Sequence, residues 1–216
     1  MEPAGKTAQA TSRRTQAERR GEAEQRLLLA ARQIVARKGW VGMTLSEVGE
    51  EAGYSRGLAT HHFGNKAGLL RALAGFVNGS FMTLVQVESP KWRPGMDALK
   101  GFVGVYLGRN DGDWTNTRAL LALMSEAVTQ DSETAQILAE YNRSVQQHLA
   151  QYISSGIANG EIRGGVEPQA GATLILGTLR GSMLQFLLDP AGINLAALRK
   201  QMLDFIEHAM AAVPPA

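Results

Sequence analysis

Residues 44–70 read TLSEVGEEAGYSRGLATHHFGNKAGLL and contain the start and stop signals of several helices in quick succession. One helix begins at Thr44, whose hydroxyl can accept from the Glu47 amide while the Glu47 carboxylate reaches back, the arrangement called a capping box. This helix ends near Gly53, which can take the left-handed conformation that turns the chain. Ser55 then caps a short third helix. The segment therefore predicts a helix, a tight turn and a second, shorter helix.

The short helix after this turn has two unlike faces. Successive helical residues are about 100° apart, so Ala59 and Phe63 share a face that can pack on the preceding helices. Gly57 and His61 lie near the opposite side, and Arg56 reaches out from the first turn. A short helix that is held by two others and surrounded by cations has the geometry used to enter the major groove of DNA. The outward face is thus a candidate DNA-reading surface.

The distribution of charge agrees with a polyanionic partner for this part of the chain. The formal net charge is only +2, but residues 1–71 carry 12 Lys and Arg against 7 Asp and Glu, a balance of +5. The remaining residues carry 10 against 13, a balance of −3. A polyanion such as DNA would therefore bind the first third of the chain.

Composition excludes several classes of protein. With 216 residues, 44% of them hydrophobic, and no Cys, the chain cannot form disulfides, thiolate metal sites or a cysteine nucleophile, and it suits the reducing cytoplasm. Residues 1–22 lack the apolar core of a signal peptide. The most apolar stretch, residues 174–188, is shorter than the about 20 residues that span a bilayer. We therefore expect a cytoplasmic protein that has no membrane partner.

The hydrophobic period is close to 3.6 from residue 22 to residue 212, which predicts an all-α protein of about nine helices. Besides the short third helix, they are predicted at residues 24–38, 44–52, 66–87, 95–108, 114–129, 132–159, 168–188 and 195–212. Asn65 is the expected cap of the fourth helix, and Pro168 suits the first position of the eighth.

Several short motifs within residues 22–71 carry a family resemblance. They are Gly53-Tyr54-Ser55-Arg56-Gly57, His62-Phe63, Asn65-Lys66 and Leu69-Leu70. Together with the capped helix before them, they resemble the helix-turn-helix of the tetracycline-repressor (TetR) family. The resemblance implies a helix-turn-helix DNA-binding domain at residues 22–71, after a flexible basic arm at residues 1–21. Residues 72–216 would then form a helical domain for ligand sensing and dimerisation.

The resemblance also implies which residues contact DNA. Base edges would be approached by Arg56, Gly57 and His61. Phosphates would be contacted by Thr44, Thr60, His61, His62 and Lys66, and Ser55 at the turn completes the set. The family usually has tyrosine where this chain has Thr60, whose hydroxyl has a much shorter reach. The arginines of the basic arm either track the DNA or belong to a solvated tail; they are Arg13, Arg14, Arg19 and Arg20.

Metal sites and catalysis have little support in the sequence. His61 and His62 are adjacent on a helix and point about 100° apart, and His148 and His208 lie far away without ligand spacing. The chain lacks a nucleophile elbow, a phosphate-binding loop and a dinucleotide fingerprint. We therefore expect no metal, no cofactor and no enzymatic activity.

The larger domain contains residues that suit a ligand cavity or a dimer interface. The first set either lines a cavity for a small, apolar organic effector or packs in the core: Trp92, Phe102, Tyr106, Trp114, Met124, Tyr141 and Phe186. Arg118 and Glu126 either anchor such a ligand or are simply exposed. The second set lies at helical spacing on the last two helices and predicts a two-fold, four-helix interface: Leu174, Thr178, Gly181, Gln185, Leu198, Met202 and Phe205.

These observations predict a homodimeric, ligand-responsive transcriptional regulator. We expect it to act as a repressor, to bind a palindromic double-stranded DNA operator, and to be released by a small organic effector. The alternative is a dimeric small-molecule sensor whose DNA contact is weakened or lost, for which the threonine at position 60 is the hint.

Overall fold

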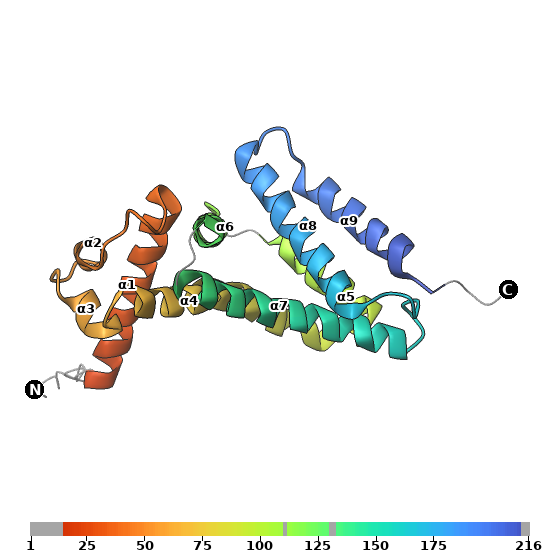
Figure 1. Ribbon diagram of the computed structural model, residues 1–216, viewed down its shortest axis with the longest axis horizontal. Coiled ribbons are helices and arrows are strands. Elements are labelled where there is room, and N and C mark those ends of the chain that lie inside the picture. Colours follow the sequence, from red (N-terminus) through yellow and green to blue (C-terminus); the bar gives the residue numbers. More distant parts are fainter. Residues whose placement is uncertain (1–14, 110–111, 130–132, 213–216) are drawn as a thin grey trace, which may run out of the picture.

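The computed structural model describes residues 15–109, 112–129 and 133–212. Within these ranges the chain forms nine α-helices and one short 3-10 helix, without a β-strand, which confirms the all-α prediction (Figure 1). The elements are α1 (Gln16–Lys38), α2 (Leu45–Glu51), α3 (Leu58–Phe63), α4 (Lys66–Glu88), η1 (Ser89–Lys91), α5 (Met96–Gly108), α6 (Thr115–Thr129), α7 (Glu133–Ala158), α8 (Pro168–Leu188) and α9 (Leu195–Met210).

Helices α1 to α3 form a head at one end, and α4 leads from this head into a body made of α5 to α9 (Figure 1). The head has its own apolar core, in which Leu27, Ile34 and Leu69 are fully buried. This core continues into α6 through Leu123, whereas a second core lies between α5, α7, α8 and α9 around Phe102. The head therefore packs directly on α6, and α4 is not its only contact with the rest of the molecule.

Local hydrogen bonds explain why the helices of the head start where they do. The Glu47 amide donates to the Thr44 hydroxyl at 3.2 Å, and the Gly68 amide donates to the Asn65 side chain at 2.8 Å. Gly53 has a φ of +78°, which confirms the predicted left-handed turn. Each of these caps pairs an amide that has no partner inside its helix.

The starts of α2 and α3 differ from the prediction in detail. The Glu47 carboxylate accepts from Lys38 Nζ at 2.6 Å, and its pKa is lowered chiefly by this bond and to a smaller extent by the Thr44 amide, so the carboxylate serves both partners. Ser55 does not cap α3, since the N-terminal cap is Gly57. The Ser55 backbone carbonyl instead accepts from the Leu58 amide at 3.1 Å, as part of the turn between α2 and α3.

The first helix is longer than predicted. It begins at Gln16 rather than at residue 24, because Thr15 and Glu18 form a complete capping box, with donor to acceptor distances of 2.7 and 3.2 Å. Residues 16–21 of the expected flexible arm are therefore helical, and Arg19 and Arg20 belong to α1. Arg13 and Arg14 lie outside the described residues.

Two segments are more apolar than the sequence reading allowed. Among the described residues, Lys66–Lys91 and Pro168–Leu188 are long enough to cross a membrane, with mean hydropathies of 1.3 and 1.2. In α4 the first turns are buried, since Leu69, Leu70 and Leu73 are fully inside the head core, whereas Leu84 and Val87 near its end are exposed. In α8 part of the apolar surface is exposed, and its place is described below.

Candidate DNA interface and body cavity

The outward face of α3 and of the turn before it is open to solvent. On the inner face of α3, Ala59 is fully buried and Phe63 packs against the head core, as the spacing predicted. Leu58 also packs against this core. The exposed residues on the other side are five of the eight predicted DNA contacts: Ser55, Arg56, Gly57, Thr60 and His61. The structure therefore brings these five together on one surface of the head.

Arg56 is held in place by a neighbour on α2. Its guanidinium Nε forms a close ion pair with the Glu50 carboxylate, and the side chains of Arg56 and Glu50 are 77% and 50% exposed. An ion pair between groups this exposed contributes little to stability. A phosphate or a guanine edge that approaches α3 can therefore compete with Glu50 for the Arg56 guanidinium.

The remaining three predicted contacts lie outside the open face of α3. Thr44 is exposed, but its hydroxyl is engaged as the cap of α2, and His62 is half-buried with its ring 6.0 Å from that of Phe63. Lys66 Nζ donates to the Val41 carbonyl at 3.0 Å. Phosphate contacts by these residues stay predictions.

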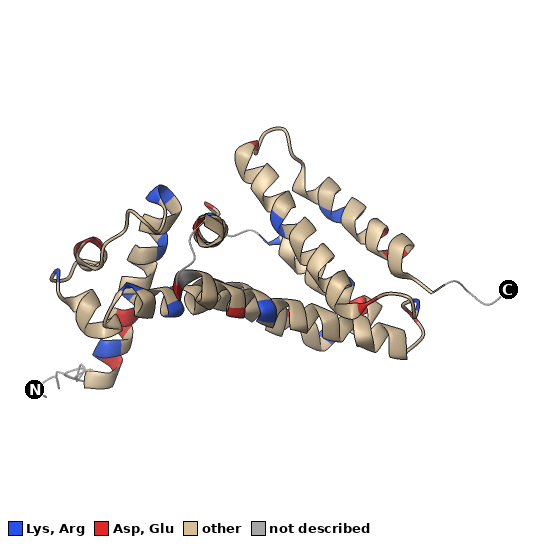
Figure 2. Cartoon of the chain, in the orientation of Figure 1, with Lys and Arg blue, Asp and Glu red and all other residues tan. Residues whose placement is uncertain are grey.

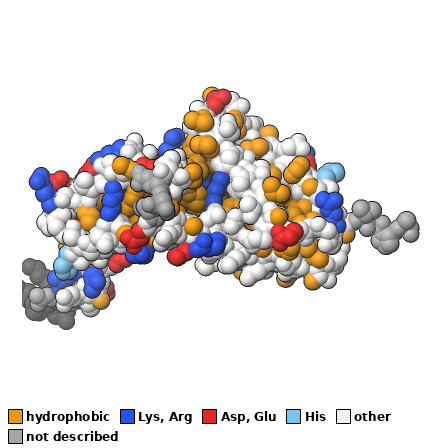
Figure 3. Space-filling model, viewed as in Figure 1, with side chains coloured by type: hydrophobic (Ala, Val, Ile, Leu, Met, Phe, Trp, Pro, Cys, Tyr) orange, Lys and Arg blue, Asp and Glu red, His pale blue; other side chains and the backbone are white. Residues whose placement is uncertain are grey.

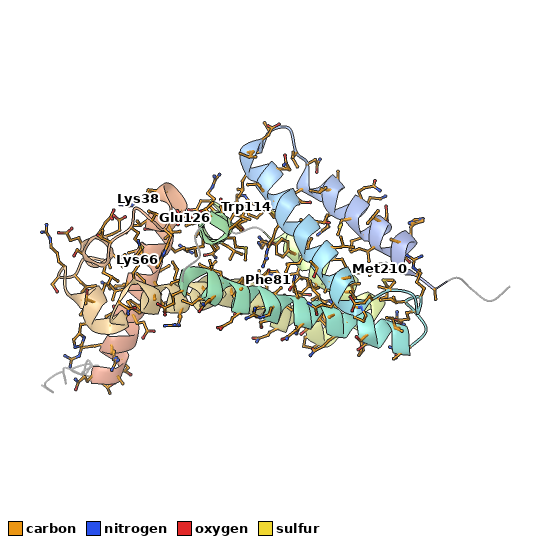
Figure 4. The ribbon with its side chains drawn as sticks, viewed as in Figure 1. Lys38, Lys66, Phe81, Trp114, Glu126 and Met210 are labelled. Atoms are coloured by element: carbon orange, nitrogen blue, oxygen red, sulfur yellow. The ribbon has the colours of Figure 1, made fainter. Side chains whose placement is uncertain are left out.

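The Lys66 side chain lies at a joint between the head and α6. Its ammonium is 5.1 Å from the centre of the Trp40 ring, and burial lowers its pKa below the usual range, against the opposing effect of Glu126. The Glu126 carboxylate accepts from the Trp40 amide at 2.9 Å and from the Val41 amide at 3.0 Å. Figure 4 shows Lys66, Glu126 and Lys38 close together at this junction.

Glu126 is therefore not merely exposed, one of the two roles that the sequence left open, because its carboxylate accepts from two backbone amides of the head. It holds the chain at the end of α1, where Gly39 has a φ of +79° and a Cβ would collide with the Glu126 carboxylate. Sequence reasoning missed this contact because the partners are backbone amides 86 and 85 residues away. Arg118, the other candidate anchor, is exposed.

A small cavity of about 60 Å³ lies in the body between α4, α5, α6 and α7. Two of the seven predicted cavity residues line it, Tyr106 and Tyr141. Nine residues that were not predicted complete its wall: Val77, Asn78, Ser80, Phe81, Leu84, Arg109, Asn116, Thr117 and Leu120. Figure 4 labels Phe81 near the middle of the molecule, where the ribbons of α4 and α7 overlap in this view.

The other five predicted residues are not part of this cavity wall. Phe102 is fully buried in the second core with its ring 5.3 Å from that of Phe81, and Trp114 packs edge-on against Phe186 at 5.3 Å. Trp92 lines a separate surface hollow beside Gly101, and Met124 is half-buried on α6. The aromatic residues alone did not identify the cavity, because the sequence does not show which apolar residues fill the core and which border an empty space.

Helices α8 and α9 share a face that is apolar and open. Leu174 is 72% exposed and Phe205 is 64% exposed. All seven predicted interface residues line two shallow hollows that adjoin at Thr178, one of about 310 Å³ and one of about 420 Å³. Arg180 is the only charged side chain of α8, and Figure 2 shows how few charges this helix carries. Figure 3 shows apolar side chains exposed on this half of the molecule.

Among the residues that the structure describes, His, Asp and Glu side chains do not gather into any group of three that could hold a metal ion. His148 is engaged elsewhere, with Nε2 2.9 Å from the Tyr152 hydroxyl, and burial lowers its pKa.

A short, exposed helix on a small helical head, joined to a larger helical body, defines a DNA-binding protein of the helix-turn-helix class. Comparison with known families agrees. Residues 27–73 match the family described as "Bacterial regulatory proteins, tetR family", and residues 95–211 match "BetI-type transcriptional repressor, C-terminal". The chain belongs to the TetR family of bacterial transcriptional regulators.

Individual relatives share part of the sequence or the fold. The HTH-type transcriptional regulator CymR of Pseudomonas putida is 34% identical over 88 residues, which are 41% of this chain and 43% of CymR. A TetR-family regulator from Rhodococcus sp. has a TM-score of 0.78 at 24% identity, over 88% of this chain and all of that one. A transcriptional regulator from Saccharomonospora viridis, solved in complex with choline, has a TM-score of 0.73 at 22% identity, over 89% of this chain and all of that one.

Proposed function

We propose that this regulator is a homodimeric repressor that binds a palindromic operator through α3 and leaves it when a small organic effector enters the body. The observation that carries the proposal is the open face of α3, where Ser55, Arg56, Gly57, Thr60 and His61 are all exposed while Ala59 opposite them is buried. Gly57 has no side chain, so the backbone can approach the base edges closely. The cytoplasm is the compartment in which we expect it to act.

The dimer is supported by the face that α8 and α9 share. Exposed leucine and phenylalanine side chains in the same hollow are costly in water, at about 25 cal/mol for each Å² of apolar surface, and a second copy would cover them. In the proposed dimer, a two-fold axis through this face would place the two heads on one side of the assembly. Each α3 would then enter the major groove at one of two half-sites, about 34 to 36 Å apart.

The route from cavity to head is supported by α6. Its first turns supply Asn116, Thr117 and Leu120 to the cavity wall, and its last turns supply Glu126 to the head. Arg32 of α1 donates to the Asn116 side chain at 3.0 Å, so one helix contacts both the cavity and two points on α1 and its following loop. A ligand that prefers a different position of α6 must weaken operator binding by the same coupling factor.

A selection from a random duplex pool with the full chain, at near-physiological salt, tests the DNA-binding part of this proposal. We expect an enriched sequence with two inverted half-sites. If a folded dimer enriches nothing, and no bound compound is found on extraction, the dimeric sensor without DNA binding replaces the repressor. Thr60 favours that outcome, since its exposed side chain carries the hydroxyl less far from the helix than the tyrosine that is usual in the family.

A further inference from the structure

The cavity wall has one formal charge among its eleven lining residues, the Arg109 guanidinium. The rest of the wall is apolar, aromatic or neutral and polar. Tyr141 is neutral, as tyrosine is at physiological pH, and burial raises its pKa further, to about 12; its hydroxyl donates to the Asn78 side chain at 3.2 Å. The wall therefore carries a net positive charge.

The Arg109 guanidinium has neutral partners. One terminal nitrogen donates to the Tyr106 carbonyl and the other donates to the Thr117 hydroxyl at 2.9 Å. Its central carbon is 4.2 Å from the centre of the Tyr106 ring and 5.5 Å from that of Phe81. Among the described residues, no carboxylate lies within ion-pair distance of Arg109. In contrast, four arginines of α1, α4 and the turn before α3 each pair with a glutamate: Arg26, Arg37, Arg56 and Arg71.

Two further guanidiniums lie next to residues that line the cavity. Arg180 donates to the Asn142 side chain, and its carbon is 6.0 Å from the centre of the Tyr141 ring. Arg32 donates to Asn116, and the Nε atoms of Arg32 and Arg180 are buried without a partner. Arg32 has a carboxylate nearby, since its charge lowers the pKa of Asp113. A charge taken out of water without a counter-ion is costly, so Arg109 and Arg180, whose partners are carbonyl, hydroxyl, amide and ring groups, make this region attractive to an anion.

We propose that the effector is a small apolar monocarboxylate, whose carboxylate binds Arg109 and the Thr117 hydroxyl and whose body lies against Phe81, Leu84 and Leu120. This rests on the proposed function, in which the cavity is the effector site. A planar carboxylate matches the two-nitrogen fork of a guanidinium. Because the wall contains one guanidinium, it favours a ligand with a single carboxylate. The cavity is small, about 60 Å³, but its wall includes Leu84, which is 45% exposed, so the apolar body of a ligand can extend outward over this side chain.

The test measures ligand binding without DNA, so that it is independent of operator recognition. The probes are benzoate, hexanoate and 3-phenylpropanoate, each with its amide and its amine. Thermal shift and calorimetry are recorded on the full chain and on Arg109→Gln. Arg118→Gln is the matched control, since Arg118 is exposed one residue after Thr117 on the same helix. Thr117→Val is a second variant, which removes the hydroxyl but keeps the guanidinium.

We expect at least one acid to bind, its amide and amine to bind at least tenfold more weakly, and Arg109→Gln to lose about tenfold or more of the acid affinity. Arg118→Gln should bind like the unmodified chain, and Thr117→Val should lose affinity even if Arg109→Gln does not fold. Equal binding of acid and amide, unchanged affinity in a folded Arg109→Gln, or no binding by any acid would overturn the proposal. If an acid binds through Arg109 but leaves a protein–operator complex intact, the ligand class stands and the effector part of the proposed function fails.

Discussion

His61 is exposed on α3, on the side away from the buried Ala59. This position determines the expected effect of replacing the imidazole on DNA binding. An imidazole that reads a base edge contributes to the choice of sequence, whereas general affinity comes from phosphate contacts. We expect His61→Ala to bind unselected DNA nearly as well as the unmodified chain but to lose preference at one position of each half-site. A binding-site selection repeated with the variant measures this, and an unchanged base preference would remove His61 from the reading surface.

Glu50 is a second residue whose effect follows from one contact, its ion pair with Arg56. Removing the carboxylate charge frees the Arg56 guanidinium and takes a negative charge away from approaching phosphates. We expect Glu50→Gln to bind duplex DNA several-fold more tightly, with little change in stability because both groups are exposed. Glu51→Gln, which removes the charge that pairs with Arg37, is the control. Equal gains in both variants would mean that net charge, and not Arg56, is responsible.

At the scale of the element, the contact between α6 and the end of α1 depends on one carboxylate. Glu126→Gln keeps the shape but replaces a charged acceptor of two amides by a neutral one, at a cost of about 1 to 3 kcal/mol. We expect faster hydrogen exchange at the Trp40 and Val41 amides and a weaker response of operator binding to effector. Glu133→Gln is the control, because its ion pair links α4 and α7 with both partners more than half exposed.

If Glu126→Gln and Glu133→Gln show the same hydrogen exchange and the same effector response, the Glu126 contact only stabilises the fold, and α6 does not couple the body to the head.

The elements that the sequence predicted well are those whose ends carry local signals. Asn65 and Pro168 start α4 and α8 where expected, because a cap or a missing amide acts within one turn. The first helix was predicted too short, although Thr15 and Glu18 carry the same type of signal as Thr44 and Glu47, because residues 16–23 lack an apolar stripe.

Contacts between elements were less predictable. The open face of α3 follows from helical spacing, so Gly57 and His61 were placed correctly on its exposed side. Glu126 acts across 86 residues through the Trp40 amide, whereas Arg109 reaches the Thr117 hydroxyl across the loop between α5 and α6, and no periodic pattern marks either partner. The aromatic residues of the body were found as a group, but only packing in three dimensions shows that Phe102 fills the core while Tyr106 borders a void.

At the scale of the whole molecule, the account requires a two-fold dimer through α8 and α9. Phe205→Glu places a charge in the apolar hollow beside Leu174, and burying it against a second copy would be costly. We expect this variant to be monomeric by light scattering at micromolar concentration, folded, and poor at binding DNA. Val128→Glu is the control, because Val128 is 87% exposed on α6, away from this face. A dimeric Phe205→Glu would place the interface elsewhere.

The central claim is that two heads of one dimer read two half-sites together. The most direct measurement is the affinity of the full chain for its selected operator, compared with the same duplex carrying five extra base pairs between the half-sites. This insertion turns one half-site by about half a helical turn, so the two α3 helices can no longer face both grooves. The account predicts two chains for each intact operator and a loss of affinity of at least tenfold on insertion. Equal affinity for both duplexes would contradict it.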